Sequence, residues 1–227
     1  MPLTVKICGL TTQESVRAAV DGGAEMVGFV FFAKSPRNLA LHKARELSAL
    51  LAGRAQKVAL VVDPEDVQIE EIVQELRPDW LQLHGAESPE RVADLRKKFG
   101  IPILKAIGVA EPEDLARADA YSGVADRLLL DAKPPKGGGL PGGNGLAFDW
   151  TLAKGFSART GSANWLLSGG LSPDNVGQAI GLTGAPGVDV SSGVEDSPGK
   201  KSVEKIRAFI AAVRHAQDQL GLATRSV

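Results

Sequence analysis

The feature that most constrains the fold is a repeat in which short apolar segments alternate with segments of helical period. The apolar segments span residues 3–8, 25–32, 57–62, 79–84, 102–108, 126–131, 164–170 and 187–193. The helical segments span residues 11–20, 41–51, 65–76, 89–99, 111–121, 148–156, 172–180 and 201–220. Because the apolar segments are continuous runs, they are typical of parallel strands covered by helices. Eight such units predict an α/β fold, a single parallel eight-stranded (β/α)8 TIM barrel, with a doubly wound open sheet as the alternative.

Candidate helix starts support this division of the chain. Thr11 and Glu14 have the spacing of a capping box. Three further pairs place a cap residue before a first-turn proline, namely Asp63-Pro64, Ser88-Pro89 and Ser172-Pro173. We expect one barrel domain over residues 1–221, followed by a polar, frayed tail over residues 222–227.

Composition and charge narrow the classes of function and partner. Hydrophobic residues make up 44% of the chain, and no apolar run approaches the roughly 18 residues of a membrane span. The start lacks the pattern of a signal peptide, and one cysteine cannot form an internal disulfide, so we expect a cytoplasmic protein with no membrane partner. The 26 Lys+Arg balance 27 Asp+Glu without a basic block, which argues against a nucleic-acid partner.

Metal and dinucleotide sites are not expected. His42 and His215 lie in predicted helices without a partner at metal-ligand spacing, and the sequence has no cysteine cluster. The stretch GGGLPG at residues 137–142 fits G-x-G-x-x-G but does not lie directly between a strand and a helix. We therefore predict no cofactor and interpret residues 132–147 as a mobile lid.

Polar residues gather at the predicted carboxyl ends of the strands, where barrels of this kind carry their chemistry. They are Cys8, Ser35-Pro36-Arg37, His84, Asp131, Ser168-Gly169-Gly170, Asp189 and Ser191-Ser192-Gly193. Each of them taken alone has a plain structural explanation, such as a packed thiol, a turn or a solvated arginine. Their meeting at one rim predicts an active site.

Two of these residues are candidates for acid-base chemistry. Asp131 follows three leucines, so burial at the barrel mouth is expected to raise its pKa toward that of a useful acid. Cys8 can serve as a base if a neighbouring positive charge lowers its pKa. Lys6 lies on the same strand face and supplies that charge, unless it belongs to a structural ion pair.

The remaining strand-end residues suit a phosphorylated ligand. Gly169-Gly170 and Ser191-Ser192-Gly193 follow strands seven and eight, where barrels commonly bind phosphate through backbone N–H groups. Arg37 has the planar guanidinium that suits a carboxylate.

Seven separated motifs, in order, closely resemble the phosphoribosylanthranilate isomerase family of tryptophan biosynthesis. They are KICGL, GFVFFAKSPRNL, LQLHG, LLLDAKPP, GGNGLAFDW, LSGGLSPDNV and GVDVSSGVEDSPGKK, and they cover the chain from about Lys6 to Lys201. The resemblance implies a cofactor-independent isomerase acting on a phosphorylated small molecule. Residues 132–147 are longer than the minimal loop of the family.

The resemblance also implies a role for each residue of the site. The implied reaction is an Amadori rearrangement, an aldose-ketose isomerisation with Asp131 as general acid and Cys8, as thiolate, as general base. Arg37 would hold the anthranilate carboxylate, Asp189 would lie near the sugar, and His84 would belong to the site wall. The implied phosphate-binding residues are Gly169, Gly170, Ser191, Ser192 and Gly193.

Two other activities stay open on the sequence. A histidine-pathway aminoaldose-ketose isomerase performs the same rearrangement, but its family carries an aspartate where Cys8 stands. A Schiff-base aldolase acting on a sugar phosphate would use Lys6 or Lys105 as its nucleophile. A phospho-ligand sensor without catalysis would not need Cys8 and Asp131 together. The sequence is compatible with a monomer or a homodimer.

Overall fold

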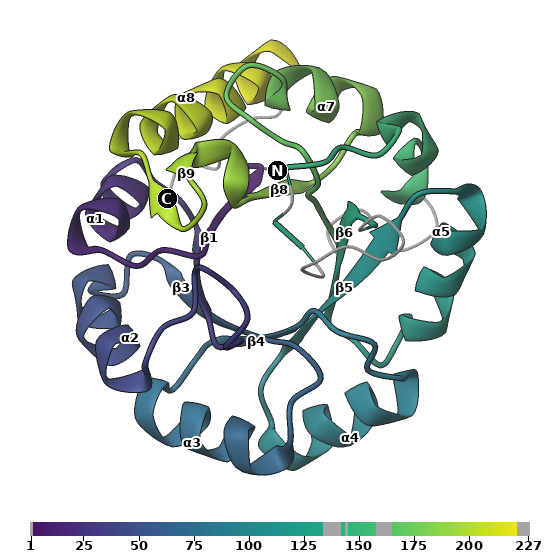
Figure 1. The fold of residues 1–227 in the computed structure, drawn as a ribbon. Helices are drawn as coiled ribbons and strands as arrows, with labels where there is room; N and C mark the ends of the chain where they lie inside the picture. The colour runs from purple at the N-terminus through teal and green to yellow at the C-terminus, as the bar shows by residue number, and fades with distance from the viewer. Residues whose placement is uncertain (1, 134–141, 144, 158–164, 222–227) are drawn as a thin grey trace.

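Eight parallel strands close into a barrel in the computed structural model, and helices cover its outside (Figure 1). The structure describes residues 2–133, 142–143, 145–157 and 165–221. The strands are β1 (Thr4–Cys8), β2 (Met26–Val30), β3 (Gln56–Val61), β4 (Trp80–Leu83), β5 (Ile103–Val109), β6 (Arg127–Ala132), β7 (Trp165–Leu167) and β8 (Gly187–Val190). They pair in sequence order, and β8 returns to β1, so the predicted barrel is confirmed.

The outer elements follow the predicted helical segments. The α-helices whose bounds lie within the described residues are α1 (Gln13–Asp21), α2 (Leu41–Ser48), α3 (Asp66–Leu76), α4 (Pro89–Phe99), α5 (Pro112–Ala118), α7 (Val176–Thr183) and α8 (Val203–Gln219). The 3-10 turns are η1 (Ala49–Leu51), η2 (Asp119–Tyr121), η3 (Trp150–Ala153) and η4 (Ser192–Val194). The helix predicted over residues 148–156 contains the short turn η3 instead of a continuous α-helix.

Successive side chains along each strand point alternately to the outside and to the inside of the barrel, so the core has an outer and an inner part. On β1, Val5 and Ile7 pack into the large cluster shared with the helices, whereas Lys6 and Cys8 point into the barrel. A second cluster, inside the barrel, is apolar and includes Met26. Cys8, at the carboxyl end of β1, belongs to a separate interior cluster with Val30 and Leu60.

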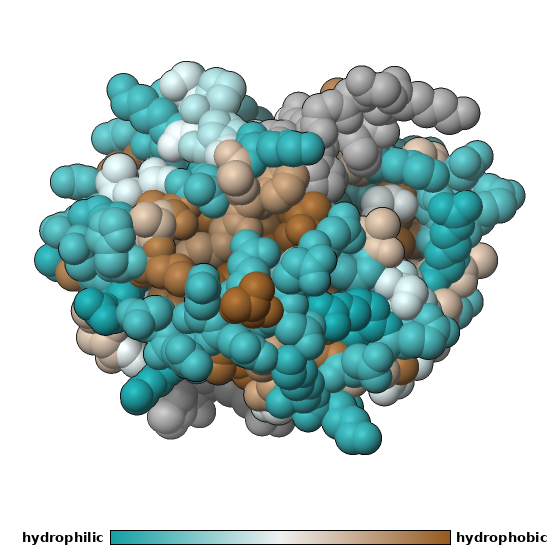
Figure 2. Space-filling model, turned by 60° about the horizontal axis from the view of Figure 1, so that its bottom comes forward, coloured by the Kyte–Doolittle hydropathy of each residue, from teal (hydrophilic) through white to brown (hydrophobic). Residues whose placement is uncertain are grey.

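The surface on the side of α3 and α4 is largely hydrophilic. Figure 2 views the molecule from the side of α3 and α4, and hydrophilic side chains cover most of that face. Helix α3 is an example of this pattern, because Ile69, Ile72 and Leu76 are buried while Asp66 and Glu70 form ion pairs with Lys98 of α4. No described helix combines the length and the apolar character that crossing a membrane requires.

One predicted helix start is confirmed, and another lies one residue later than predicted. Ser88 caps α4 by accepting a hydrogen bond from Arg91 N, with Pro89 in the first turn, as predicted. The capping box of α1 uses Thr12 and Ser15, one residue later than its predicted start at Thr11.

The other two predicted helix starts are wrong. Asp63 has a left-handed backbone, with φ of 45°, and its carboxylate accepts from Ala86 N, so it braces the neighbouring loop instead of capping α3. Ser172 is followed by a turn, and α7 begins after Asn175, whose Oδ1 accepts from Ser172 N. In both places the proline lies in the loop before the helix.

A short hairpin that the sequence analysis treated as loop follows β8. Strands β9 (Glu195–Ser197) and β10 (Lys200–Lys201) pair antiparallel between η4 and α8. Figure 1 shows this segment at the rim of the barrel, near β1 and β8. The predicted tail at 222–227 and most of the predicted lid at 132–147 lie outside the described residues.

Candidate active site

A pocket opens at the carboxyl ends of the strands, and all the predicted site residues line it. They are Cys8, Arg37, His84, Asp131, Gly169, Gly170, Asp189, Ser191, Ser192 and Gly193. They come from six different strands or the loops that follow them, because parallel strands of a barrel end at the same rim. The structure therefore brings together every residue that the sequence analysis selected for the site.

Cys8 ends β1 and its thiol faces this pocket. The thiol is free and buried. Gly28 on the neighbouring strand leaves room for it, since a Cβ at that position would lie 2.8 Å from Sγ. Burial raises the pKa of the Cys8 thiol, and the nearby ammonium groups of Lys6 and Lys201 oppose this rise without cancelling it. Lys6 lowers the pKa of the Cys8 thiol, as expected, but this effect is smaller than the rise caused by burial.

Lys6 lies beneath Cys8 in the barrel interior and pairs with Asp189. Its Nζ is 2.7 Å from Asp189 Oδ1, and the Lys6 side chain is fully buried. Burial alone would lower the pKa of Lys6, but the Asp189 carboxylate and Cys8 together outweigh it and leave this pKa above its usual value. The second Asp189 oxygen accepts a 3.3 Å hydrogen bond from Ser168 Oγ. The Asp189 carboxylate is thus held in one orientation at the pocket wall.

Asp131 contacts His84 across the pocket. His84 Nε2 lies 3.2 Å from Asp131 Oδ2, and Ala132 N donates to Asp131 Oδ1 at 2.9 Å. On the other side of the ring, Gln82 Nε2 lies 2.9 Å from His84 Nδ1. The carboxyl group is therefore oriented by a chain of side chains that begins inside the barrel.

Arg37 is buried instead of solvated. Its Nε and Nη2 donate to the two carboxylate oxygens of Glu195 at 2.7 and 2.8 Å, and Nη2 also donates to Gly143 O at 3.1 Å. Gly9 makes this position possible, since a Cβ there would lie 2.6 Å from Arg37 Cδ. The glycine after Cys8 thus leaves space for the side chain of Arg37.

Glycines in the loops after β7 and β8 bring the backbone close to neighbouring loops. Gly169 and Gly170 both have positive φ, and a Cβ on Gly170 would lie 2.7 Å from Ala147 N. Gly193 lies against the backbone of Leu171 in the same way. The two loops meet at one side of the pocket, which is the arrangement expected for holding a phosphate through backbone groups.

The sequence analysis missed three polar contributors to this region. Glu195 and Lys201 come from the β9–β10 hairpin, and Gln82 comes from the interior of β4. The motif GVEDSPGKK contains the first two, and its Ser-Pro-Gly between charged residues is the signal of a tight turn that would have indicated the hairpin.

The described part of the chain gives no support to a lysine nucleophile or to a metal centre. Neither Lys6 nor Lys105 lines the pocket, and Lys105 Nζ is engaged by Glu87 at 2.7 Å and by Gly85 O at 2.8 Å. Among the residues that the structure describes, no group of three or more His, Cys, Asp or Glu side chains is placed to hold a metal ion.

Comparisons with known proteins point to one family. The family model described as N-(5'-phosphoribosyl)anthranilate (PRA) isomerase matches residues 5–212. The N-(5'-phosphoribosyl)anthranilate isomerase of Chelativorans sp. (strain BNC1) is 52% identical over 217 residues, which cover 96% of this chain and 98% of that relative. A solved phosphoribosyl anthranilate isomerase in complex with reduced 1-(o-carboxyphenylamino)-1-deoxyribulose 5-phosphate is 35% identical, with a TM-score of 0.81 over 94% of this chain and 99% of its own. Monomers of the dimeric enzyme from Thermotoga maritima give 35% identity and a TM-score of 0.80 over the same shares.

Proposed function

The chain belongs to the N-(5'-phosphoribosyl)anthranilate isomerase family, and on this premise we propose that Cys8 and Asp131 carry out the family's reaction at the barrel mouth. The protein is a phosphoribosylanthranilate isomerase of tryptophan biosynthesis. It converts N-(5-phosphoribosyl)anthranilate into 1-(2-carboxyphenylamino)-1-deoxyribulose 5-phosphate. The observation that supports these roles most directly is that the ten residues selected from the sequence line one pocket.

The rearrangement needs one acid and one base. Asp131, in its protonated form, gives its proton to the furanose ring oxygen, the C–O bond breaks, and the chain opens to an iminium ion. Cys8, as a thiolate, then takes the proton from C2 of the sugar and leaves an enolamine. The enolamine tautomerises to the ketone, so the sequence is an isomerisation with no external oxidant or reductant.

Formation of the Cys8 thiolate is the demanding part of this mechanism. Burial raises the pKa of Cys8, so the thiol carries its proton in the free protein near neutral pH. Lys6 and Lys201 both favour the thiolate by their charge. The two ammonium groups therefore limit the cost of the buried negative charge that the base must carry.

The other residues hold the two ends of the substrate. Arg37 binds the anthranilate carboxylate through Nη1. Nε and Nη2 are already engaged by Glu195 and Gly143, whereas Nη1 has no hydrogen-bond partner among the described residues. Asp189 lies near the sugar and His84 beside the acid. The phosphate is held in the loops after β7 and β8 by Gly169, Gly170, Ser191, Ser192 and Gly193.

An anthranilate-fluorescence assay tests the proposed reaction directly. The purified protein should deplete N-(5-phosphoribosyl)anthranilate, and the product should accumulate in equal amount. A histidine-pathway isomerase would instead prefer a bulkier, doubly phosphorylated aminoaldose. Turnover of that compound together with inertness toward the anthranilate substrate would contradict the proposal.

Location and assembly complete the proposal. We propose a cytoplasmic protein, supported by a single free thiol in a biosynthetic enzyme family. The Thermotoga maritima relative is dimeric, and we propose a monomer or a homodimer for this chain. Light scattering on the purified protein distinguishes the two assemblies.

A further inference from the structure

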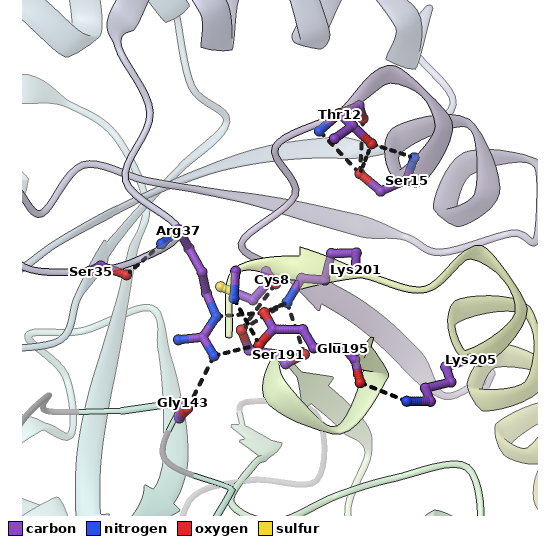
Figure 3. A network of polar contacts seen from close by, with 11 residues as sticks. Cys8, Thr12, Ser15, Ser35, Arg37, Gly143, Ser191, Glu195, Lys201 and Lys205 are labelled. Atoms are coloured by element: carbon purple, nitrogen blue, oxygen red, sulfur yellow. Dashed lines mark hydrogen bonds and ion pairs between the residues drawn. The ribbon is translucent and has the colours of Figure 1, made fainter. Parts of the chain in front are cut away.

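A single carboxylate, that of Glu195, joins the two sides of the pocket. It accepts from Arg37, which belongs to the loop after β2, and from Lys201, which belongs to β10 (Figure 3). Lys201 Nζ is 2.7 Å from Glu195 Oε1, and the side chains of both residues are almost completely buried. This cluster lies beside the reacting groups, but no step of the mechanism above uses Glu195.

On one side, Glu195 determines how Arg37 points. Two guanidinium nitrogens of Arg37, Nε and Nη2, are bound to the Glu195 carboxylate in a fork. Because the guanidinium is planar and rigid, fixing this edge also fixes the direction of Nη1. The edge left for a ligand therefore has a defined orientation in the pocket that Arg37 lines.

On the other side, Lys201 connects Glu195 to the loop after β8. Lys201 Nζ donates to Ser191 O at 2.8 Å and to Ser191 Oγ at 3.1 Å. Ser191 Oγ in turn donates to Cys8 O at 3.2 Å. The ammonium group thus fixes the first residue of the phosphate-side loop and reaches the backbone of Cys8 through it (Figure 3).

The hairpin is built to hold Glu195 in this place. Gly199 N donates to Glu195 Oε2 at 3.2 Å across the turn of the hairpin. Gly199 also lies against the loop that carries Arg37, since a Cβ there would be 2.6 Å from Pro36 O. Burial would raise the pKa of Glu195, but the charges and hydrogen bonds of Arg37 and Lys201 hold it below its usual value. The carboxylate therefore stays ionised between the two cations.

We infer that Glu195 and Lys201 are positioning residues, which hold the carboxylate-binding edge of Arg37 and the phosphate-side loop at Ser191 in a fixed relation to each other. The inference rests on the proposed function, in which Arg37 and the Ser191 loop bind opposite ends of one substrate. The substrate is recognised at both ends at once, so a fixed separation contributes to its affinity and to its alignment with Cys8.

Two ligands separate positioning from a general loss of structure. One is reduced 1-(o-carboxyphenylamino)-1-deoxyribulose 5-phosphate, and the other is its counterpart made from aniline, which keeps the phosphate but lacks the carboxylate. Glu195→Gln should weaken binding of the first by about tenfold, as expected for disturbing a charge-assisted hydrogen bond, and binding of the second much less. Lys201→Met should weaken both ligands, because both carry the phosphate.

Neighbouring residues provide matched controls. Asp196→Asn makes the same change in charge next to Glu195, but Asp196 is half exposed and pairs with Lys205. Lys200→Met repeats the lysine change at an exposed position of β10. Both controls should bind the two ligands like the wild type. Glu195→Asp, which keeps the charge but shortens the reach, should give an intermediate loss for the carboxylate ligand and provides a second variant if Glu195→Gln fails to fold.

A double-mutant cycle with Arg37→Ala separates this inference from the proposed function. If Glu195 acts through Arg37, Glu195→Gln loses its selective effect on the carboxylate ligand in the Arg37→Ala background. Equal weakening of both ligands by folded Glu195→Gln, or an effect that persists without Arg37, overturns the positioning role. If Arg37→Ala itself binds the two ligands in the wild-type ratio, the assignment of Arg37 in the proposed function is wrong, and the inference falls with it.

Discussion

Lys6 Nζ lies 2.7 Å from Asp189 Oδ1 in the barrel interior, two residues before Cys8 on β1. Both side chains are buried, so each charge depends on the other. The Lys6–Asp189 pair therefore contributes both to the stability of the barrel and to the positive charge next to the Cys8 thiol. The free energy of unfolding and its pH dependence measure this contribution.

Lys6→Met should lower the free energy of unfolding by about 3 to 5 kcal/mol, because it leaves the Asp189 carboxylate buried without its cationic partner. The pKa of Lys6 is raised in the folded protein, so its contribution to stability is complete below its ordinary pKa of 10.5 and is lost as the pH rises through the raised value. Urea unfolding of both proteins at neutral pH and at pH 11 measures the difference. A difference that stays unchanged between these pH values would contradict the pairing.

Cys8→Ala and Asp131→Asn should each lower kcat by about 10²-fold or more, the effect expected from losing a positioned base or acid. Both variants should keep the fold and should bind a product analogue nearly as well as the wild type. Steady-state turnover together with circular dichroism measures this. Near-normal turnover by either folded variant would remove that residue from the mechanism.

The pH dependence of kcat/KM should be bell-shaped, because the reaction needs Cys8 ionised and Asp131 protonated at the same time. Because burial raises the pKa of Cys8, the limb set by this thiol should lie at a higher pH than a limb set by an exposed carboxylate base. Cys8→Asp should move that limb to lower pH, since a carboxylate ionises more readily than a thiol. An active Cys8→Asp variant in which neither limb moves would direct the search for the base to His84.

Arg37→Ala should raise KM more than it lowers kcat, because the carboxylate that Arg37 is proposed to bind is present in substrate and transition state alike. The variant also leaves Glu195 with Lys201 as its remaining side-chain partner. Its folded content should therefore be measured beside its kinetics. A wild-type KM in a folded variant would remove Arg37 from substrate binding.

Dialysis against EDTA should leave activity unchanged, and added nicotinamide or flavin cofactors should not increase it. The reaction moves protons only, and among the residues described by the structure no set of side chains forms a metal site. Activity lost on dialysis and restored by one metal would contradict the acid-base mechanism.

The strand-end residues could be predicted because a parallel barrel brings the carboxyl ends of its strands to one rim. Cys8 and Asp131 are 123 positions apart in the chain, yet each ends or nearly ends a strand that the apolar pattern identifies. This prediction uses only the apolar pattern of the sequence and requires no knowledge of side-chain contacts.

The positions of Glu195 and Lys201 could not be predicted in the same way. The contact of Arg37 with Glu195 spans 158 positions, and the hairpin that carries the carboxylate has strands of three and two residues, too short for a periodic pattern. The helix starts predicted from the prolines at 64 and 173 are wrong for a related reason. The residue that caps a helix is determined by hydrogen bonds that form only in the folded loop.

The glycine beside the thiol also affects how the protein can be labelled. Cys8 is almost completely buried, its Sγ lies against Gly28, and the residue lines the pocket at the barrel mouth. A small alkylating reagent should therefore react faster than a bulky disulfide reagent, and a bound ligand should protect the sulfur from both. Since the chain contains one cysteine, a fluorophore or isotopic tag attached through sulfur reports on the barrel mouth and on nothing else.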